Sequence, residues 1–232
     1  MIEDPPVLTI RRGFERPKAE AVAALTGVPS GHLVDAMGGR GAVDFRIKPV
    51  IDEGRVPSAF CGVAVTCHAG PADNLALFAA IEAARGGDVI VAATDAFEGT
   101  AVIGDLMLGM ARNRGVIAIV TDGLARDLEG IAGVGIPVFC RGVSPNSPAR
   151  NGPGTVGLPV TLGGVTVASG DLVAGDRDGV VVVPLVRAEA VAAALAEVVK
   201  REAATEKLSR SGKLRRMWDP EAFEARGVEI VE

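Results

Sequence analysis

The chain has 232 residues, a formal net charge of −5 and a mean hydropathy of +0.33, with 48% hydrophobic and 23% charged residues. These values exclude a mainly disordered chain and predict a globular protein with a large apolar core. The mild acidity argues against a dedicated nucleic-acid-binding protein, because such a domain is usually basic.

The sequence has no feature typical of a membrane or secreted protein. No apolar run reaches the length of about 18 residues that a membrane-spanning helix needs. The N-terminal segment MIEDPPVLTIRRG lacks the basic region and apolar stretch of a secretory signal. The three cysteines, Cys61, Cys67 and Cys140, show no CxxC spacing and indicate buried thiols in a reducing compartment. We therefore expect a cytoplasmic protein that has no membrane partner.

The first part of the chain predicts two helices. Residues 1–27 read as an arm followed by a helix that ends at Gly27. A second helix is predicted to begin at Ser30, a residue type favoured at the N-cap, and to stop at Gly38 and Gly39.

Residues 62–143 alternate apolar strand segments with helical segments. Strands are predicted at 62–69, 88–94, 116–123 and 136–143. Helices are predicted to follow Asp73-Asn74 and Gly104-Asp105, and 124–135 reads as a loop with a short helix. This alternation predicts an α/β layer with several parallel strands.

The pattern changes after residue 143. Residues 144–154 form a loop rich in Pro, Gly, Asn and Ser, and 155–184 read as short strands joined by tight turns. Residues 186–210 predict a strong helix, and the tail beyond it carries the only tryptophan, Trp218. We divide the chain into an arm with a helix (1–27), an α/β domain (28–185) and a C-terminal helix and tail (186–232) that we expect to contact a neighbouring subunit.

The common phosphate-binding and nucleophile motifs are absent from the sequence. There is no GxxxxGK[ST] loop, no GxGxxG after a strand and no GxSxG turn. The glycine-rich segments GGRGAV and GIAGVG are better explained as turns. His32, His68 and the three cysteines lack the spacing of a zinc site, so buried structural thiols are the favoured interpretation.

The segment 104–127 is the most informative for chemistry. Asp105 begins a helix after one apolar strand segment, and Arg126-Asp127 follow the next buried strand. If the two strands are parallel neighbours, their carboxyl ends share one edge, where α/β proteins bind ligands. Free N–H groups at the helix start, those of Leu106 and Met107, would bind an anion.

The charged side chains of this segment suit a small anion beside a divalent metal. Arg126 offers a bidentate clamp for a carboxylate. Asp105 and Asp127 offer hard oxygen ligands that suit Mg²⁺ or Mn²⁺. The alternative interpretation is that Asp105 only caps a helix and that Arg126-Asp127 is a surface pair. The spacing alone does not choose between these two interpretations.

The sequence resembles the RraA-like (regulator of ribonuclease activity A) family, which includes class II pyruvate aldolases acting on 4-hydroxy-4-methyl-2-oxoglutarate. The family signature is Asp, twenty residues and then Arg-Asp, which Asp105 and Arg126-Asp127 match. Ala72-Asp73-Asn74 matches the family's Gly-Asp-Asn with Ala in place of Gly, and PVFCRGVSP and GGVTVASGDLVAGDRDGVVVVP are also similar. The resemblance covers about residues 25–210.

The resemblance implies a fold, an assembly and a role for each residue of the site. The fold would be an α/β/β sandwich of the swivelling phosphohistidine-domain type, assembled as a homotrimer or hexamer with active sites between subunits. The roles are metal binding by Asp127, retention of the metal's waters by Asp105, binding of keto-acid oxygens by Arg126, binding of the pyruvyl carboxylate by the Leu106 and Met107 amides, substrate contact by Asn74, and contact with the metal's waters by a neighbouring subunit's Glu202, with Glu206 as the alternative.

The implied activity is divalent-metal-dependent cleavage of a 4-hydroxy-2-keto acid to pyruvate and a second carbonyl product, together with oxaloacetate decarboxylation. Residues 62–143 contain no lysine, so a Schiff-base mechanism has no nucleophile there. The tail departs from that of the better-defined aldolases, and the substituent on C4 of the substrate therefore stays open.

Other functions remain as alternatives. Some family members are protein regulators of ribonuclease E rather than enzymes. Others are named as menaquinone methyltransferases, which the absence of a glycine-rich adenosylmethionine loop disfavours. RNA binding would use a basic cluster, but the interleaved Glu202 and Glu206 favour a solvated helix face or a subunit contact. That cluster comprises Lys200, Arg201, Lys207, Arg210, Lys213, Arg215 and Arg216.

Overall fold

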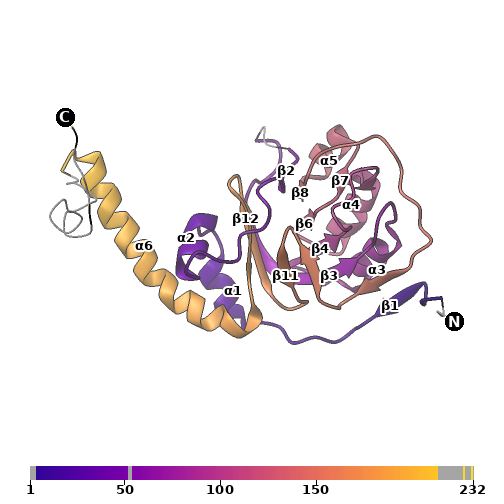
Figure 1. Cartoon of the computed structure of the whole chain (residues 1–232), viewed down its shortest axis with the longest axis horizontal. Helices are drawn as coiled ribbons and strands as arrows, with labels where there is room; N and C mark the ends of the chain where they lie inside the picture. The colour runs from indigo at the N-terminus through magenta and orange to yellow at the C-terminus, as the bar shows by residue number, and fades with distance from the viewer. Residues whose placement is uncertain (1–3, 52–53, 214–226, 228–230, 232) are drawn as a thin grey trace. The chain divides into compact units, whose positions relative to one another are not determined.

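The structure is a computed structural model that describes residues 4–51, 54–213, 227 and 231. By their internal contacts the residues divide into two units, Met1–Leu195 and Ala196–Glu232. The first unit contains the strands and most of the helices (Figure 1). The second contains the C-terminal part of helix α6 (Ala188–Arg210). Trp218 and the predicted tail contact lie outside the described residues.

A mixed sheet forms the centre of the first unit. Its main path has the order β1-β9-β3-β4-β6-β8-β2, with the β12–β13 hairpin joined through β12 to β3. Strands β3, β4, β6 and β8 are parallel, which confirms the predicted parallel layer. The strands are β1 (Leu8–Ile10), β2 (Lys48–Pro49), β3 (Phe60–His68), β4 (Asp88–Ala93), β6 (Ala118–Thr121), β8 (Val138–Cys140), β9 (Gly154–Val156), β12 (Leu172–Asp176) and β13 (Gly179–Val183).

Three helices cover one face of this sheet, and a small hairpin covers the other (Figure 1). Helices α3 (Leu75–Ala83), α4 (Asp105–Asn113) and α5 (Leu128–Val134) bury residues such as Leu77, Leu108 and Ile131 against the strands. The hairpin of β10 (Val160–Leu162) and β11 (Val165–Val167) contributes Leu162 and Val167 to a second core. Burial of these side chains supplies the main driving force for folding. The layers are those of the predicted α/β/β sandwich.

Two short helices, α1 (Ala19–Leu25) and α2 (Ser30–Ala36), bury Leu25 and Leu33 in a third core with β12 and β13. The prediction that Ser30 caps α2 is wrong. Pro29 occupies the N-cap, and Ser30 is the first helical residue. Its backbone N and its Oγ donate to the Asp176 carboxylate at 2.7 and 2.8 Å. A carboxylate that is distant in the sequence therefore caps this helix.

The N-terminal arm is attached to the sheet by a buried ion pair. Arg16 donates two hydrogen bonds to the Asp88 carboxylate, at 2.7 and 2.8 Å. The Asp88 side chain is only 1% exposed, and the hydrogen bonds to this carboxylate raise the pKa of Arg16. Strand β1 adds a parallel pairing with β9, so the arm forms part of the sheet.

The region after β4 contains a separate two-stranded ladder, of which the sequence predicted only the strand segment before Asp105. Strands β5 (Ala101–Ile103) and β7 (Leu124–Ala125) pair in parallel outside the main sheet. The short helix predicted within 124–135 is α5, and it extends through the first five residues of GIAGVG, which the glycine pattern indicated as a turn; of this segment only Gly135 adopts a left-handed conformation. No helix in the described part of the chain is long and apolar enough to cross a membrane.

Candidate functional site

The site forms where strands β5 and β7 end. Ile103 pairs with Ala125 at the end of this parallel ladder, and the Arg126 N–H donates to Ile103 O at 3.0 Å. Asp105 and Arg126-Asp127 follow the two strands almost immediately, so the predicted convergence of these segments is confirmed. Carboxyl ends of neighbouring parallel strands are common ligand sites. Here they belong to the small ladder and not to the main sheet.

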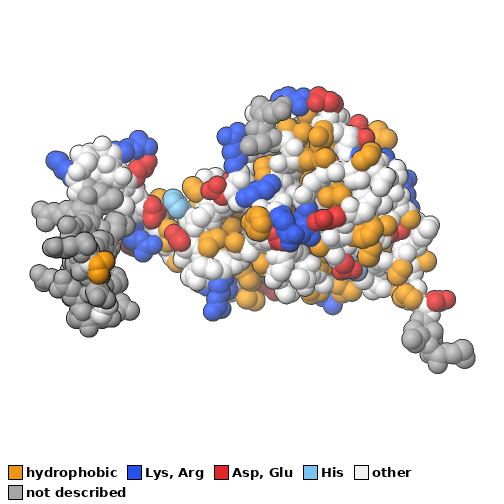
Figure 2. All heavy atoms as spheres, turned by 45° about the horizontal axis from the view of Figure 1, so that its top comes forward, with side chains coloured by type: hydrophobic (Ala, Val, Ile, Leu, Met, Phe, Trp, Pro, Cys, Tyr) orange, Lys and Arg blue, Asp and Glu red, His pale blue; other side chains and the backbone are white. Residues whose placement is uncertain are grey.

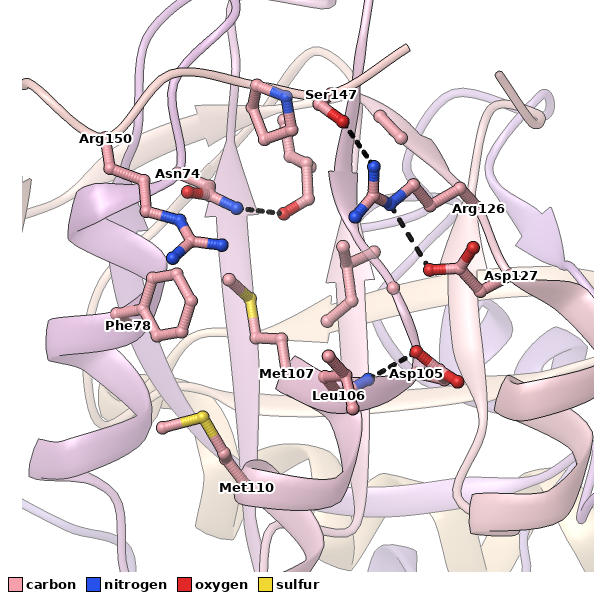
Figure 3. A pocket seen from close by; sticks show the side chains of 15 residues that line it. Asn74, Phe78, Asp105, Leu106, Met107, Met110, Arg126, Asp127, Ser147 and Arg150 are labelled. Carbon is pink, nitrogen blue, oxygen red and sulfur yellow. Dashed lines mark hydrogen bonds and ion pairs between the residues drawn. The ribbon is translucent and has the colours of Figure 1, made fainter. Parts of the chain in front are cut away.

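A cavity of about 300 Å³ opens at this point (Figure 3). Its walls come from β5, the start of α4, the residues after β7, helix α3 and the loop before β9. This volume lies at the lower end of the range typical of small-molecule sites. The lining residues that carry side-chain chemistry are Asn74, Phe78, Asp105, Leu106, Met107, Met110, Arg126, Asp127, Ser147 and Arg150.

Asp105 is the first residue of α4, and its carboxylate is already engaged. Its Oδ1 accepts a hydrogen bond from the Leu106 N–H at 2.7 Å. The Leu106 amide is therefore not the free donor that the sequence predicted, because the neighbouring carboxylate occupies it. The Leu106 side chain is 83% exposed at the rim of the cavity, whereas the Met107 side chain is buried.

Asp127 adopts a left-handed backbone conformation, with φ +61° and ψ +50°, as the N-cap residue of α5. Few residues other than glycine adopt this conformation, although aspartate does so more readily than most. Strained residues of this kind concentrate at functional sites. The Asp127 carboxylate lies on the same side of the cavity as that of Asp105 (Figure 3).

Two glycines make room for the two carboxylates. A Cβ atom on Gly104 would lie 2.5 Å from Asp127 Oδ2, and one on Gly130 would lie 2.1 Å from Asp105 Oδ2. Neither distance is possible for a real side chain without displacement of the carboxylate. The space around both aspartates therefore depends on glycine at positions 104 and 130.

Arg126 is held in place through two of its three guanidinium nitrogens. Its Nε lies 3.2 Å from Asp127 Oδ2, and its Nη1 donates to Ser147 Oγ at 2.5 Å. The third nitrogen points into the cavity (Figure 3). The guanidinium is thus oriented before any ligand arrives, and its remaining N–H groups can donate to an anionic oxygen.

Asn74 lies on the opposite side of the cavity with its amide orientation fixed. Its Nδ2 donates to Val102 O at 3.1 Å, and a carbonyl can only accept, so the Oδ1 atom faces away from Val102. This Oδ1 is buried and has no hydrogen-bond partner among the described residues. An unsatisfied buried acceptor is costly, and a ligand donor or a water would relieve that cost.

The sequence did not identify four residues of the cavity: Phe78, Met110, Ser147 and Arg150. The Arg150 guanidinium lies over the Phe78 ring, 4.7 Å from its centroid. Ser147 and Arg150 belong to the segment 144–154, which the composition marked only as a loop. The available signal was its position directly after a strand of an α/β layer, where loops carry function.

The donor set fits a magnesium-type ion. Among the described residues no group of three or more His, Cys, Asp and Glu side chains is placed to hold a metal. Mg²⁺ needs fewer protein ligands, because it is usually held by one or two carboxylates together with waters and substrate oxygens. Asp105 and Asp127, with the space that Gly104 and Gly130 leave around them, meet that requirement.

Glu202 and the cysteines are not among the residues that line the cavity. Glu202 belongs to α6 within the unit Ala196–Glu232, so its approach to a neighbouring subunit's site stays a prediction. Burial raises the pKa of Cys67 to about 12 and that of Cys61 and Cys140 to about 11. These thiols stay protonated at neutral pH and are poor nucleophiles.

Comparison with known proteins identifies the family. A family model described as RraA-like, Aldolase/RraA, matches residues 30–182, which is more than half of the chain. The chain belongs to the RraA-like family. A protein of Halalkalibacterium halodurans, named "Putative 4-hydroxy-4-methyl-2-oxoglutarate aldolase", is 36% identical over 157 residues, which cover 68% of this chain and 73% of that protein.

Solved structures of related proteins have the same RraA-like fold. An uncharacterized protein from Pseudomonas syringae is 26% identical with a TM-score of 0.73, and the match covers 86% of this chain and 96% of that one. Streptomyces coelicolor RraAS2, described as an unusual member of the RNase ES inhibitor RraA protein family, is 28% identical with a TM-score of 0.69. That match covers 88% of this chain and 100% of the other.

Proposed function

We propose that this RraA-like protein is a divalent-metal-dependent lyase that cleaves a 4-hydroxy-2-keto acid to pyruvate and a second carbonyl product, and that also decarboxylates oxaloacetate. One observation carries the proposal. Two carboxylates and one oriented guanidinium, Asp105, Asp127 and Arg126, meet in a single cavity at the ends of β5 and β7. The name of the relative from Halalkalibacterium halodurans supports the same reaction class.

The two aspartates would hold the ion, which is Mg²⁺ or Mn²⁺ on the chemistry of their oxygens. Asp127 would bind it directly, and Asp105 would hold its waters. The ion, when bound, supplies positive charge that stabilises the negative charge developing on the keto oxygen as the C3–C4 bond breaks.

Arg126 and the start of α4 bind the pyruvyl end of the substrate. The free N–H groups of Arg126 donate to the keto-acid oxygens and stabilise the charge that they gain in the transition state. The Met107 amide, near the N-terminus of the nine-residue helix α4, donates to the pyruvyl carboxylate. The Leu106 amide joins it once the Asp105 carboxylate releases its hydrogen bond.

The same site suits both reactions because both produce the enolate of pyruvate. In the aldol cleavage the C4 hydroxyl gives its proton to a water beside the Asp105 and Asp127 carboxylates and becomes the carbonyl of the second product, while the electron pair of the C3–C4 bond moves to the pyruvate fragment. The enolate then takes up a proton at C3 to give pyruvate. In oxaloacetate decarboxylation CO₂ leaves instead, and no hydroxyl proton has to be removed. Asn74 Oδ1, an acceptor at the cavity wall with no partner among the described residues, is suited to a substrate hydroxyl.

We also propose that the protein is a cytoplasmic homotrimer or hexamer whose sites lie between subunits. The described chain offers only two carboxylates at the cavity. Leu106 and Met110, at its rim, are 83% and 42% exposed. A neighbouring subunit that covers these apolar side chains would bury them and bring a third acidic group, for which Glu202 is the candidate.

The test is pyruvate release from oxaloacetate, measured with Mg²⁺, with EDTA and with the D127A variant. Free Mg²⁺ itself promotes this decarboxylation, so a reaction with metal and no protein is the baseline. The proposal predicts turnover above that baseline that needs both the metal and Asp127. Folded wild-type protein without turnover above the baseline would refute the proposed activity.

The second candidate function is regulation of a ribonuclease by direct contact. It is favoured by the similarity to Streptomyces coelicolor RraAS2 over 88% of this chain. The two functions separate experimentally, because a regulator slows RNA cleavage by ribonuclease E without any keto-acid turnover. Loss of that inhibition in D127A would not be expected, since a docking surface needs no metal ligand.

A further inference from the structure

The segment 143–152 forms no helix or strand, yet it is bonded to all three parts of the chain that carry the site. It lies between β8 and β9 and supplies Ser147 to the cavity wall (Figure 3). Its backbone hydrogen bonds reach β7, the start of β5 and the turn before α3. A loop orients a functional side chain reliably only where its own backbone is held in place.

The first half of this segment is bonded to the small ladder of β5 and β7. Ser144 N donates to Ala125 O, in β7, at 3.0 Å. Asn146 O accepts a hydrogen bond from Ala101 N, at the start of β5, also at 3.0 Å. The residue directly before Ser147 is therefore fixed to the strand that leads to the start of α4.

The second half of the segment is bonded to the turn before α3. The N–H and the O of Ala149 both form hydrogen bonds with this turn, at 2.7 and 3.1 Å. Asp73, which is 6% exposed, accepts a hydrogen bond from Asn151 N at 2.6 Å. Hydrogen bonds to a charged acceptor are stronger than those between neutral groups. The backbone is thus anchored on both sides of Ser147, within two residues of it.

The anchored segment presents one hydroxyl to Arg126. Arg126 Nη1 donates to Ser147 Oγ at 2.5 Å, while its Nε lies 3.2 Å from Asp127 Oδ2. In the proposed function the Asp127 carboxylate has a second task, because it would also bind the ion. Within the described residues the Ser147 side chain has no other hydrogen-bond partner. Its hydroxyl can therefore hold the guanidinium independently of the ion.

We propose that Ser147 is a positioning residue for Arg126, and that the segment 143–152 keeps its hydroxyl in register with the ends of β5 and β7. This inference rests on the proposed function, in which Arg126 binds the keto-acid oxygens. The hydrogen bond restricts the guanidinium to one orientation, which lowers the ordering cost when a ligand binds. Asp73 acts one step further away, because it holds the far end of the segment.

Pyruvate binding tests the role of Ser147. Isothermal titration in the presence of Mg²⁺ measures the pyruvate affinity of the wild type, S147A, S147T and S144A. S147T keeps a hydroxyl at the same position. S144A is the matched control: it removes a hydroxyl from the same segment, where Ser144 Oγ accepts only a long bond of 3.3 Å from Asn146 N and does not line the cavity.

S147A is expected to bind pyruvate about 5- to 10-fold more weakly than the wild type, as for the loss of one exposed hydrogen bond to a charged group. S147T and S144A should stay within about twofold of the wild type, because the first retains the acceptor and the second does not contact the guanidinium. Equal pyruvate affinities of S147A and the wild type, with both proteins folded, would overturn the proposal.

A double-mutant cycle with Arg126 separates positioning from a general structural effect. In the R126M background the Ser147 hydroxyl has no guanidinium to orient. R126M/S147A is therefore expected to bind pyruvate within about twofold of R126M. The same 5- to 10-fold loss in both backgrounds would overturn the proposal, because Ser147 would then act on the fold or directly on the ligand.

Oxaloacetate turnover separates this inference from the proposed function. A wild type that releases pyruvate from oxaloacetate, with an S147A variant of equal pyruvate affinity, leaves the reaction standing and refutes the role of Ser147. An affinity loss that needs both Ser147 and Arg126, without oxaloacetate turnover, supports the positioning role and refutes the proposed reaction. A wild type that neither binds pyruvate nor turns over oxaloacetate refutes both.

Discussion

Gly130 gives the sharpest test of the arrangement around Asp105. A methyl group at this position would lie 2.1 Å from Asp105 Oδ2 and 2.5 Å from Asp105 Cβ, so G130A must displace the carboxylate and also shift the helices α4 and α5 relative to each other. Gly130 lies within α5, where alanine is favoured over glycine by about 1 kcal/mol. Displacement also loses the hydrogen bond from Leu106 N to Asp105 Oδ1, a loss of about 1 kcal/mol at this exposed position. These two effects nearly cancel, and the clash with Asp105 Cβ adds a cost of about 1–3 kcal/mol, because side-chain rotation cannot relieve it.

We therefore expect G130A to fold with a free energy of unfolding about 1–3 kcal/mol below that of the wild type. In the folded variant the turnover of oxaloacetate should fall about 100-fold, the size of effect that a misplacement of 1 Å produces in an active site. The assay is pyruvate release with Mg²⁺, together with thermal unfolding with and without Mg²⁺. The stabilisation that Mg²⁺ gives the wild type should shrink in the variant, because binding to the folded state raises stability by mass action.

G133A is the matched control, since it lies in the same helix and a Cβ there meets nothing within 4 Å. It should keep full turnover, with a free energy of unfolding equal to or up to about 1 kcal/mol above that of the wild type. Full turnover and an unchanged Mg²⁺ response in folded G130A would refute the reasoning, because the carboxylate of Asp105 would then not be needed where the structure places it.

Three further predictions concern stability. D73A removes the buried acceptor of three backbone N–H groups, and its free energy of unfolding, measured with urea, should fall by about 3 kcal/mol. An unchanged urea midpoint would show that these three hydrogen bonds do not stabilise the fold. Ala72 has φ +57°, so A72G should raise the free energy of unfolding by about 1 kcal/mol in the same assay, and a loss of stability would show that the left-handed conformation costs alanine nothing there. Burial raises the pKa of Cys67 to about 12 from an unfolded value of 9.0, so between pH 9 and 12 the unfolded chain loses its thiol proton while the folded chain keeps it, and the free energy of unfolding falls as the pH rises. The free energy of unfolding of C67V should fall less steeply over that range, and equal slopes would exclude the Cys67 thiol as a cause of the decline.

The sequence predicted the parallel strands because their burial leaves a continuous apolar run. β4 is buried along its whole length, and so is β6, so neither shows alternation and both are recognised by length and composition. Strand β7 has only two residues, which is too short to show any period. The cap of α2 was missed because Asp176, its acceptor, is 146 residues away in the chain.

The sequence likewise predicted some residues of the candidate site and missed others. Asp105, Arg126 and Asp127 could be found because strand ends bring fixed sequence positions to one edge. Arg150 could not be found in this way, because its place at the cavity depends on a contact between distant parts of the chain. The Asp73 carboxylate accepts a hydrogen bond from the N–H of Asn151, which is 78 residues away in the sequence. The role of Gly130 was also hidden, because the clash that it avoids involves a different helix.

The energetics of the cavity favour an enzyme over a docking surface. Asp127 holds a left-handed conformation that costs about 1–3 kcal/mol in a residue other than glycine. Gly130 gives up about 1 kcal/mol of helix stability relative to alanine. Asn74 keeps a buried oxygen without a partner among the described residues. Asn74 and Asp127 line one cavity, and Gly130 lies beside Asp105, which also lines it. A surface that only binds a ribonuclease gains nothing from these three costs, whereas a site that orients a small anion and an ion before reaction requires the space and the orientation that they provide.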